Sequence, residues 1–95
     1  MINCIKEKIT YDNKEYKLML VTKDFIYYGI TEESDENRNV VMIRKNNNEV
    51  VSDNYFAYNE LFSYLEEIQE GKYKKSIDYF YLSEECKEYI SNIKD

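Results

Sequence analysis

The sequence predicts an α+β domain in which an antiparallel sheet of four to six strands packs on one face against two helices. Two observations predict this class. Residues 4–52 contain several short runs that alternate apolar and polar residues, which is typical of strands, and residues 54–70 repeat apolar residues at the spacing of a helix. The 95 residues fit a single domain spanning 1–95, and an apolar content of 43% supports a folded core.

Five runs in the first half of the chain are predicted strands, joined as a meander. They cover residues 4–10, 15–22, 25–31, 39–45 and 49–52. Asp12 and Asn13 follow the first run, and three asparagines at 46–48 follow the fourth. These residue types favour tight turns, so we expect neighbouring runs to pair as antiparallel hairpins.

The second run is expected to divide its side chains between the two faces of the sheet. Alternation places Tyr16, Leu18 and Leu20 on one face. It places Lys17, Met19 and Val21 on the other face. Gly29 in the third run is expected to mark a bulge or a close contact with a helix, since glycine is uncommon inside strands.

The main helix is predicted over about 54–70. Its apolar residues form one broad face and are Ala57, Tyr58, Leu61, Phe62, Tyr64, Leu65 and Ile68. Asn59, Glu60, Ser63, Glu66, Glu67 and Glu70 fall on the opposite face. Asp53 or Asn54 can cap the start of the helix, and Gly71 can end it.

The last part of the chain predicts one ambiguous element and one helix. Residues 76–82 fit either a strand, through Ile77, Tyr79 and Tyr81, or a helix, and we favour a strand. Ser83 is a predicted N-cap for a C-terminal helix over about 84–94. Its apolar residues are expected to face the sheet and are Cys86, Tyr89, Ile90 and Ile93.

Composition excludes most catalytic chemistry. The chain has no His, which removes the usual acid–base group and the commonest metal ligand. Its two cysteines, Cys4 and Cys86, are too few for a structural zinc site, and two glycines cannot form a phosphate-binding loop. We therefore expect a protein that is not an enzyme and that holds no metal or cofactor.

Charge and hydropathy restrict the partners. The formal charge of −6 disfavours direct binding to nucleic acid. No apolar run approaches the roughly 20 residues of a membrane span, and the N-terminus lacks a signal peptide. We expect a cytoplasmic protein with two reduced cysteines, because thiols stay reduced in that compartment.

The acidic residues are concentrated between positions 32 and 70, where ten acids face only three basic residues and give a local charge of −7. One interpretation is a solvated surface that keeps the protein soluble. The other is a surface for a basic protein partner. The candidate contact residues are Glu32, Glu33, Asp35, Glu36, Glu66, Glu67 and Glu70, with Tyr55 as an aromatic anchor.

The leading hypothesis is a non-catalytic inhibitor whose carboxylates occupy the phosphate-contacting Lys and Arg of a nucleic-acid-binding partner. Small acidic phage proteins that block bacterial defence nucleases, anti-CRISPR proteins among them, are similar in size and charge, though no motif is shared. Abundant Lys, Asn, Ile and Tyr fit AT-rich coding in a low-GC bacterium or its phages. Two alternatives remain: an antitoxin or immunity protein, and a structural or oligomeric phage protein with a Tyr-rich surface. The partner and the stoichiometry stay open.

Overall fold

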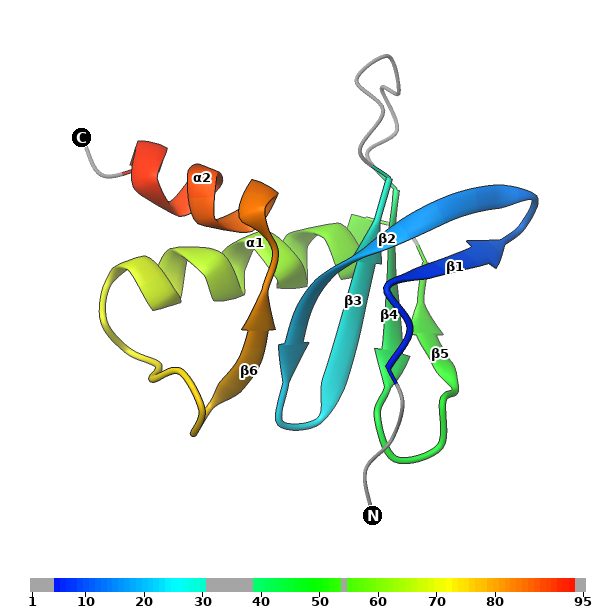
Figure 1. Ribbon diagram of the computed structural model, residues 1–95, viewed down its shortest axis with the longest axis horizontal. Helices are drawn as coiled ribbons and strands as arrows, with labels where there is room; N and C mark the ends of the chain where they lie inside the picture. The colour runs from blue at the N-terminus through cyan, green and yellow to red at the C-terminus, as the bar shows by residue number, and fades with distance from the viewer. Residues whose placement is uncertain (1–4, 31–38, 54, 94–95) are drawn as a thin grey trace.

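The computed structural model describes residues 5–30, 39–53 and 55–93 (Figure 1). Its elements are β1 (Lys8–Tyr11), β2 (Lys14–Thr22), β3 (Phe25–Gly29), β4 (Val40–Arg44), β5 (Val50–Ser52), α1 (Tyr55–Gln69), β6 (Tyr79–Leu82) and α2 (Glu84–Ile93). The five strands β1 to β5 pair antiparallel in sequence order, and β6 pairs with β2. The predicted α+β class, the meander and both helices are confirmed.

Tight turns form where the sequence predicts them. Asp12 and Asn13 have φ values of 53° and 65°, and Asn48 has a φ of 60°. Asp and Asn adopt this left-handed region more readily than other non-glycine residues. The β2–β3 turn is closed by the backbone N–H of Phe25, which donates to Thr22 Oγ1 at 3.1 Å.

The alternation predicted for β2 is wrong beyond Leu18, because Met19 is an extra residue in the strand. Leu18 lies opposite Tyr28, and Leu20 lies opposite Tyr27, so Met19 forms a β-bulge. The bulge turns Met19 and Leu20 to the same face and sends Val21 to the other. A Cβ on Gly29 would lie 3.2 Å from Met19 Cε, so Gly29 gives room to this bulge and not to a helix.

The bulge also divides one edge of β2 between two strands. Before it, the backbone N–H of Leu18 donates to the carbonyl oxygen of Glu7, which precedes β1. After it, the carbonyl oxygen of Met19 accepts from the N–H of Ser83 at the end of β6. Thus β1 and β6 lie on the same side of β2, one after the other, and the sheet curls around this point (Figure 1).

Both faces of the curled sheet are buried. The helix-side core joins the sheet to both helices and contains Met19, Leu20, Tyr27, Val40, Met42, Ala57, Leu61, Leu65, Tyr79 and Cys86. The opposite core contains Tyr16, Leu18, Val21, Ile26, Tyr28 and Val41, covered by Ile5, Ile9 and Tyr11. The hydroxyl of Tyr11 donates to Asp53 Oδ2 at 2.8 Å, which ties the end of β1 to the segment after β5.

The main helix α1 buries the predicted face and is terminated by the predicted glycine, Gly71. Ala57, Leu61 and Leu65 are its buried residues. Gly71, with φ of 85°, donates its N–H to the carbonyl of Ile68, while the N–H of Lys72 reaches the carbonyl of Glu67. This is a Schellman motif, which requires a left-handed residue after the helix. Asn54, one of the two predicted caps, lies outside the described residues.

The segment at 76–82 contains a strand, as favoured, but its facing differs from simple alternation. Tyr79 and Leu82 face the helix-side core, while Phe80 and Tyr81 are exposed. The pairing of β6 with β2 is irregular at this point, so two consecutive side chains point outward. The expectation that Tyr79 and Tyr81 share a face is therefore wrong.

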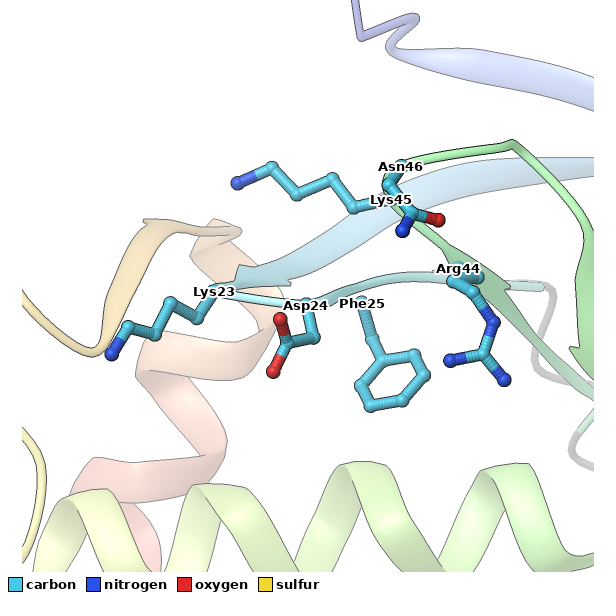
Figure 2. A pocket seen from close by; sticks show the side chains of 6 residues that line it. All are labelled: Lys23, Asp24, Phe25, Arg44, Lys45 and Asn46. Atoms are coloured by element: carbon cyan, nitrogen blue, oxygen red, sulfur yellow. The ribbon is translucent and has the colours of Figure 1, made fainter.

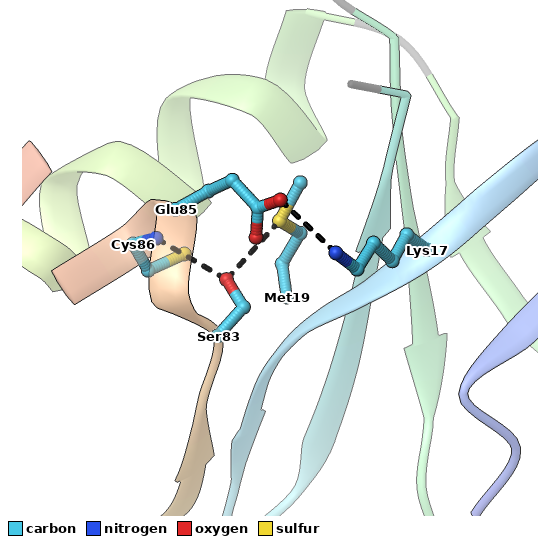
Figure 3. Close-up of polar contacts among 5 residues, drawn as sticks. All are labelled: Lys17, Met19, Ser83, Glu85 and Cys86. Carbon is cyan, nitrogen blue, oxygen red and sulfur yellow. Dashed lines mark hydrogen bonds and ion pairs between the residues drawn. The ribbon is translucent and has the colours of Figure 1, made fainter. Parts of the chain in front are cut away.

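Helix α2 is fixed by contacts that start from its N-cap (Figure 3). Ser83 Oγ accepts the backbone N–H of Cys86 at 3.2 Å and donates to Met19 Sδ at 3.4 Å. The ammonium of Lys17 pairs with Glu85 at 3.0 Å on the surface above them. The predicted cap is confirmed, and the thiol of Cys86 is buried and free. Cys4 lies outside the described residues.

Candidate partner-binding surface

The outer side of α1 carries carboxylates and no basic side chain. Glu60 and Glu66 are exposed and Glu67 is half-buried, whereas Lys and Arg are absent from the helix. These acids lie away from Ala57, Leu61 and Leu65 because a helix turns 100° per residue. The described part of the predicted surface is therefore one side and the C-terminal end of α1.

Tyrosines from other elements lie beside the carboxylates of Glu66 and Glu67. Tyr73, in the segment after α1, donates its hydroxyl to Glu67 Oε1 at 2.9 Å. Its ring stacks on Tyr64 with centroids 4.2 Å apart and planes 4° from parallel, so the hydroxyl is held in place. This hydrogen bond, followed by burial, raises the pKa of Tyr73.

Glu66 has a similar neighbour on α2. Burial first, and then the negative charge of Glu66, raise the pKa of Tyr89. The ring of Tyr89 packs edge to face on Phe62 of α1 at 4.8 Å, which fixes the tyrosine against the helix. The carboxylates of Glu66 and Glu67 therefore lie beside tyrosine hydroxyl groups.

Glu70 differs because it has a basic partner. Its carboxylate pairs with the ammonium of Lys72 at 3.3 Å, and both side chains are more than half exposed. Exposed pairs of this kind contribute little to stability, but the pair reduces the negative charge at the end of the helix. Among the three acids predicted on the helix, Glu66, Glu67 and Glu70, Glu70 is thus the least available to a basic partner.

Tyr55 lies at the other end of α1. It is 72% exposed and packs edge to face on Tyr58 at 6.1 Å. A rise of 1.5 Å per residue puts Tyr55 about 16 Å along the helix from Glu66. The aromatic residue and the acidic end therefore belong to one helix but not to one contact cluster.

The acidic loop residues Glu32, Glu33, Asp35 and Glu36 lie outside the described residues. Ile30 and Asn39, which flank this segment, are joined by a backbone hydrogen bond of 3.3 Å at the end of β3 and β4. That the loop and the helix act as one surface stays a prediction.

Two surface features were not predicted from the sequence. Ile77 and Phe80 are exposed on and beside β6, with Ile77 60% exposed. The irregular pairing that turns Phe80 and Tyr81 outward has no clear sequence signal. The second feature is a group of three cations, Lys23, Arg44 and Lys45, at the β2–β3 turn and the end of β4. These residues come together only through the register of β3 with β4.

Across residues 5–30, 39–53 and 55–93, no group of three or more His, Cys, Asp or Glu side chains could hold a metal ion. Neither of the two helices in these ranges is long and apolar enough to cross a membrane. Comparisons with protein-family models, with characterised proteins and with solved structures found no match to this chain.

Proposed function

We propose that this protein is a non-catalytic inhibitor that binds a basic, nucleic-acid-binding protein through its acidic surface. The observation that carries the proposal is the outer side of α1, where Glu66 and Glu67 are supported by tyrosines and no base of the helix neutralises them. Carboxylates form strong, bidentate hydrogen bonds with Arg, the residue that such partners use for phosphate. Carboxylates held in place lose less side-chain freedom on binding, which favours affinity.

The proposal includes the biological setting. Size and charge are similar to those of small phage proteins that block bacterial defence nucleases, the anti-CRISPR proteins among them. In this setting the protein acts in the cytoplasm of the infected bacterium. An antitoxin or immunity protein would use the same contacts, and the identity of the partner distinguishes the two.

Self-assembly is the second candidate function. It is favoured by the exposed Ile77 and Phe80 at an edge strand, since exposed apolar residues at a sheet edge promote pairing with another chain. Sizing chromatography across a range of concentrations distinguishes this candidate. A defined oligomer that forms without any partner would support it, and a monomer would oppose it.

The test of the inhibitor proposal is charge reversal with a matched control. The partner is first captured from a host lysate with the wild-type protein. The test variant changes Glu66, Glu67 and Glu70 to Lys. The control changes Glu7, Glu15 and Glu49 to Lys, which alters the net charge equally but at residues outside α1.

We expect the test variant to lose affinity strongly at low salt while the control binds almost as well as wild type. Like charges across an interface repel, and the wild-type affinity should fall as salt rises. Thermal unfolding of both variants checks that the fold is retained. If both variants bind like wild type at low salt, the proposal is wrong and the acids only keep the protein soluble.

Tyr73→Phe tests the supporting role of the hydroxyl. The substitution keeps the ring that stacks on Tyr64 but removes the donor to Glu67. We expect weaker binding than wild type with little change in melting temperature. Full affinity in this variant would show that the tyrosine does not position Glu67 for the partner.

A further inference from the structure

A cavity of about 330 Å³ lies at one end of the sheet, at the β2–β3 turn (Figure 2). It is lined by Lys23, Asp24, Phe25, Arg44, Lys45 and Asn46, from the β2–β3 turn and the end of β4. The register of β3 with β4 places Phe25 opposite Arg44 and so joins these two regions. Ile30 and Asn39, which flank the acidic segment, lie at the other end of the same two strands.

The backbone around this cavity is held by hydrogen bonds. The N–H of Lys45 donates to the carbonyl of Asp24 at 2.8 Å, which ties the two turns together. The N–H of Arg44 donates to the carbonyl of Glu49, also at 2.8 Å. The cationic side chains therefore start from fixed positions at strand ends, which is a requirement for a specific binding site.

Two of the three cations are held by aromatic rings. The guanidinium carbon of Arg44 lies 5.6 Å from the centre of the Phe25 ring. The ammonium of Lys45 lies 4.6 Å from the centre of the Phe80 ring and donates to the carbonyl of Thr22 at 3.2 Å. A cation–π contact orients a cation but does not cancel its charge, so both groups stay available to an anion.

Three other cations of the described residues are paired with carboxylates. Lys17, Lys72 and Lys87 each pair with a glutamate within 3.4 Å. Among the described residues, by contrast, Lys23, Arg44 and Lys45 form no ion pair with a carboxylate, although Asp24 lines the same cavity. Three cations and one acid give this end of an otherwise acidic protein a local charge of +2.

We propose that this cavity binds the phosphate group of a small organic phosphate that also carries hydroxyl groups, such as a sugar phosphate or a nucleoside monophosphate. The Arg44 guanidinium can donate two parallel hydrogen bonds to phosphate oxygens, and Lys23 and Lys45 add charge. Asp24 repels phosphate but accepts hydrogen bonds from hydroxyl groups, so it favours a ligand that presents both. The volume is at the lower end of the range for small-molecule sites.

The proposal does not depend on the inhibitor proposal, because it uses another end of the domain. It is tested by amide NMR titrations with ribose 5-phosphate, inorganic phosphate and adenosine, with sodium chloride at matched ionic strength. We expect both phosphates to shift the signals around residues 23–25 and 44–46, with ribose 5-phosphate binding more tightly. Adenosine and chloride should leave these signals unchanged.

Variants separate the contributions of the cations and the acid. Arg44→Gln should weaken binding of both phosphates about tenfold or more, because it removes charge-assisted hydrogen bonds. Lys14→Gln, in the β1–β2 hairpin, loses the same charge away from the cavity and should bind like wild type. Asp24→Asn should remove the advantage of ribose 5-phosphate over inorganic phosphate without weakening the latter.

Three outcomes would overturn the proposal. The first is that phosphate causes no shift around the cavity. The second is that chloride at the same ionic strength produces the same shifts, which would indicate general screening of surface charge. The third is that Arg44→Gln and Lys14→Gln weaken binding equally, which would show that net charge and not the cavity determines affinity.

Discussion

Truncation of Leu65 tests how α1 is held on the sheet. Its side chain is fully buried between the helix and the strands, with a relative exposure of 0%. Leu65→Ala leaves the backbone contacts in place and removes most of the side chain. The loss therefore reports on packing in the helix-side core.

The expected magnitude follows from burial. Transfer of a leucine side chain from water to a core is worth about 1.5–3 kcal/mol, and the remaining cavity increases the loss to about 2–5 kcal/mol. Alanine is the better helix former, so the measured loss slightly understates the packing contribution. At about 0.05–0.15 kcal/mol per residue, a chain of 95 residues has a total free energy of unfolding of roughly 5–14 kcal/mol. One truncation thus removes a large share of the stability.

Urea unfolding followed by circular dichroism measures this loss. We expect the midpoint to fall with little change in the slope, because the surface exposed on unfolding stays nearly the same. Ile77→Ala is the control: it also shortens an aliphatic side chain, but Ile77 is 60% exposed, and the change should stay within about 0.5 kcal/mol. Equal midpoints for Leu65→Ala and wild type would refute the packing of α1 on the sheet.

Three further predictions concern single features of the fold. Gly71→Ala should destabilise by about 1–2 kcal/mol, since φ is 85° while the space around a new Cβ is open, and Gly71→Asn should cost less; equal urea midpoints for all three proteins would contradict this. Burial raises the pKa of the Cys86 thiol, so this thiol should react slowly with thiol reagents in the native protein, whereas both cysteines should react in denaturant. Rapid labelling of Cys86 in the native protein, or no reactive thiol in denaturant, would contradict this prediction. Burial, then the neighbouring Tyr73, raises the pKa of Tyr64 to about 12 from 10. Between these pH values the unfolded chain loses a proton that the native protein keeps, so stability should fall as pH rises above about 10. The fall should be less steep in Tyr64→Phe, and an equal slope in both proteins would rule out this contribution.

The helices were predictable because their signals are local. Apolar residues recur at helical spacing along α1, and Ser83 precedes α2 as a cap. The bulge at Met19 was not predictable, since residues 18–21 are all apolar and their pattern does not indicate which face each side chain meets. The pairing of β6 with β2 was missed for a related reason: the sequence specifies a strand but not its distant partner.

The candidate site was predicted only in part. Helical spacing placed Glu66 and Glu67 opposite the apolar face, but it could not indicate that Tyr73 hydrogen-bonds Glu67 or that Tyr89 lies near Glu66. The cation group was missed because Lys23 and Arg44 are distant in sequence and meet only through the register of β3 with β4. Contacts of this kind depend on tertiary structure and not on local pattern.

The two cores differ in how far apart along the chain their residues lie, and this difference bears on the order of folding. Among the described residues, the core opposite the helices uses those between Ile5 and Ile43, whereas the helix-side core extends from Met19 to Ile90. Contacts between nearby residues lose less chain entropy when they form, so we expect the β1–β4 meander to form before β6 and α2 join it. In pulse-labelled hydrogen exchange, amides of β2 and β3 should become protected earlier than those of α2. Earlier protection of α2 would contradict this order.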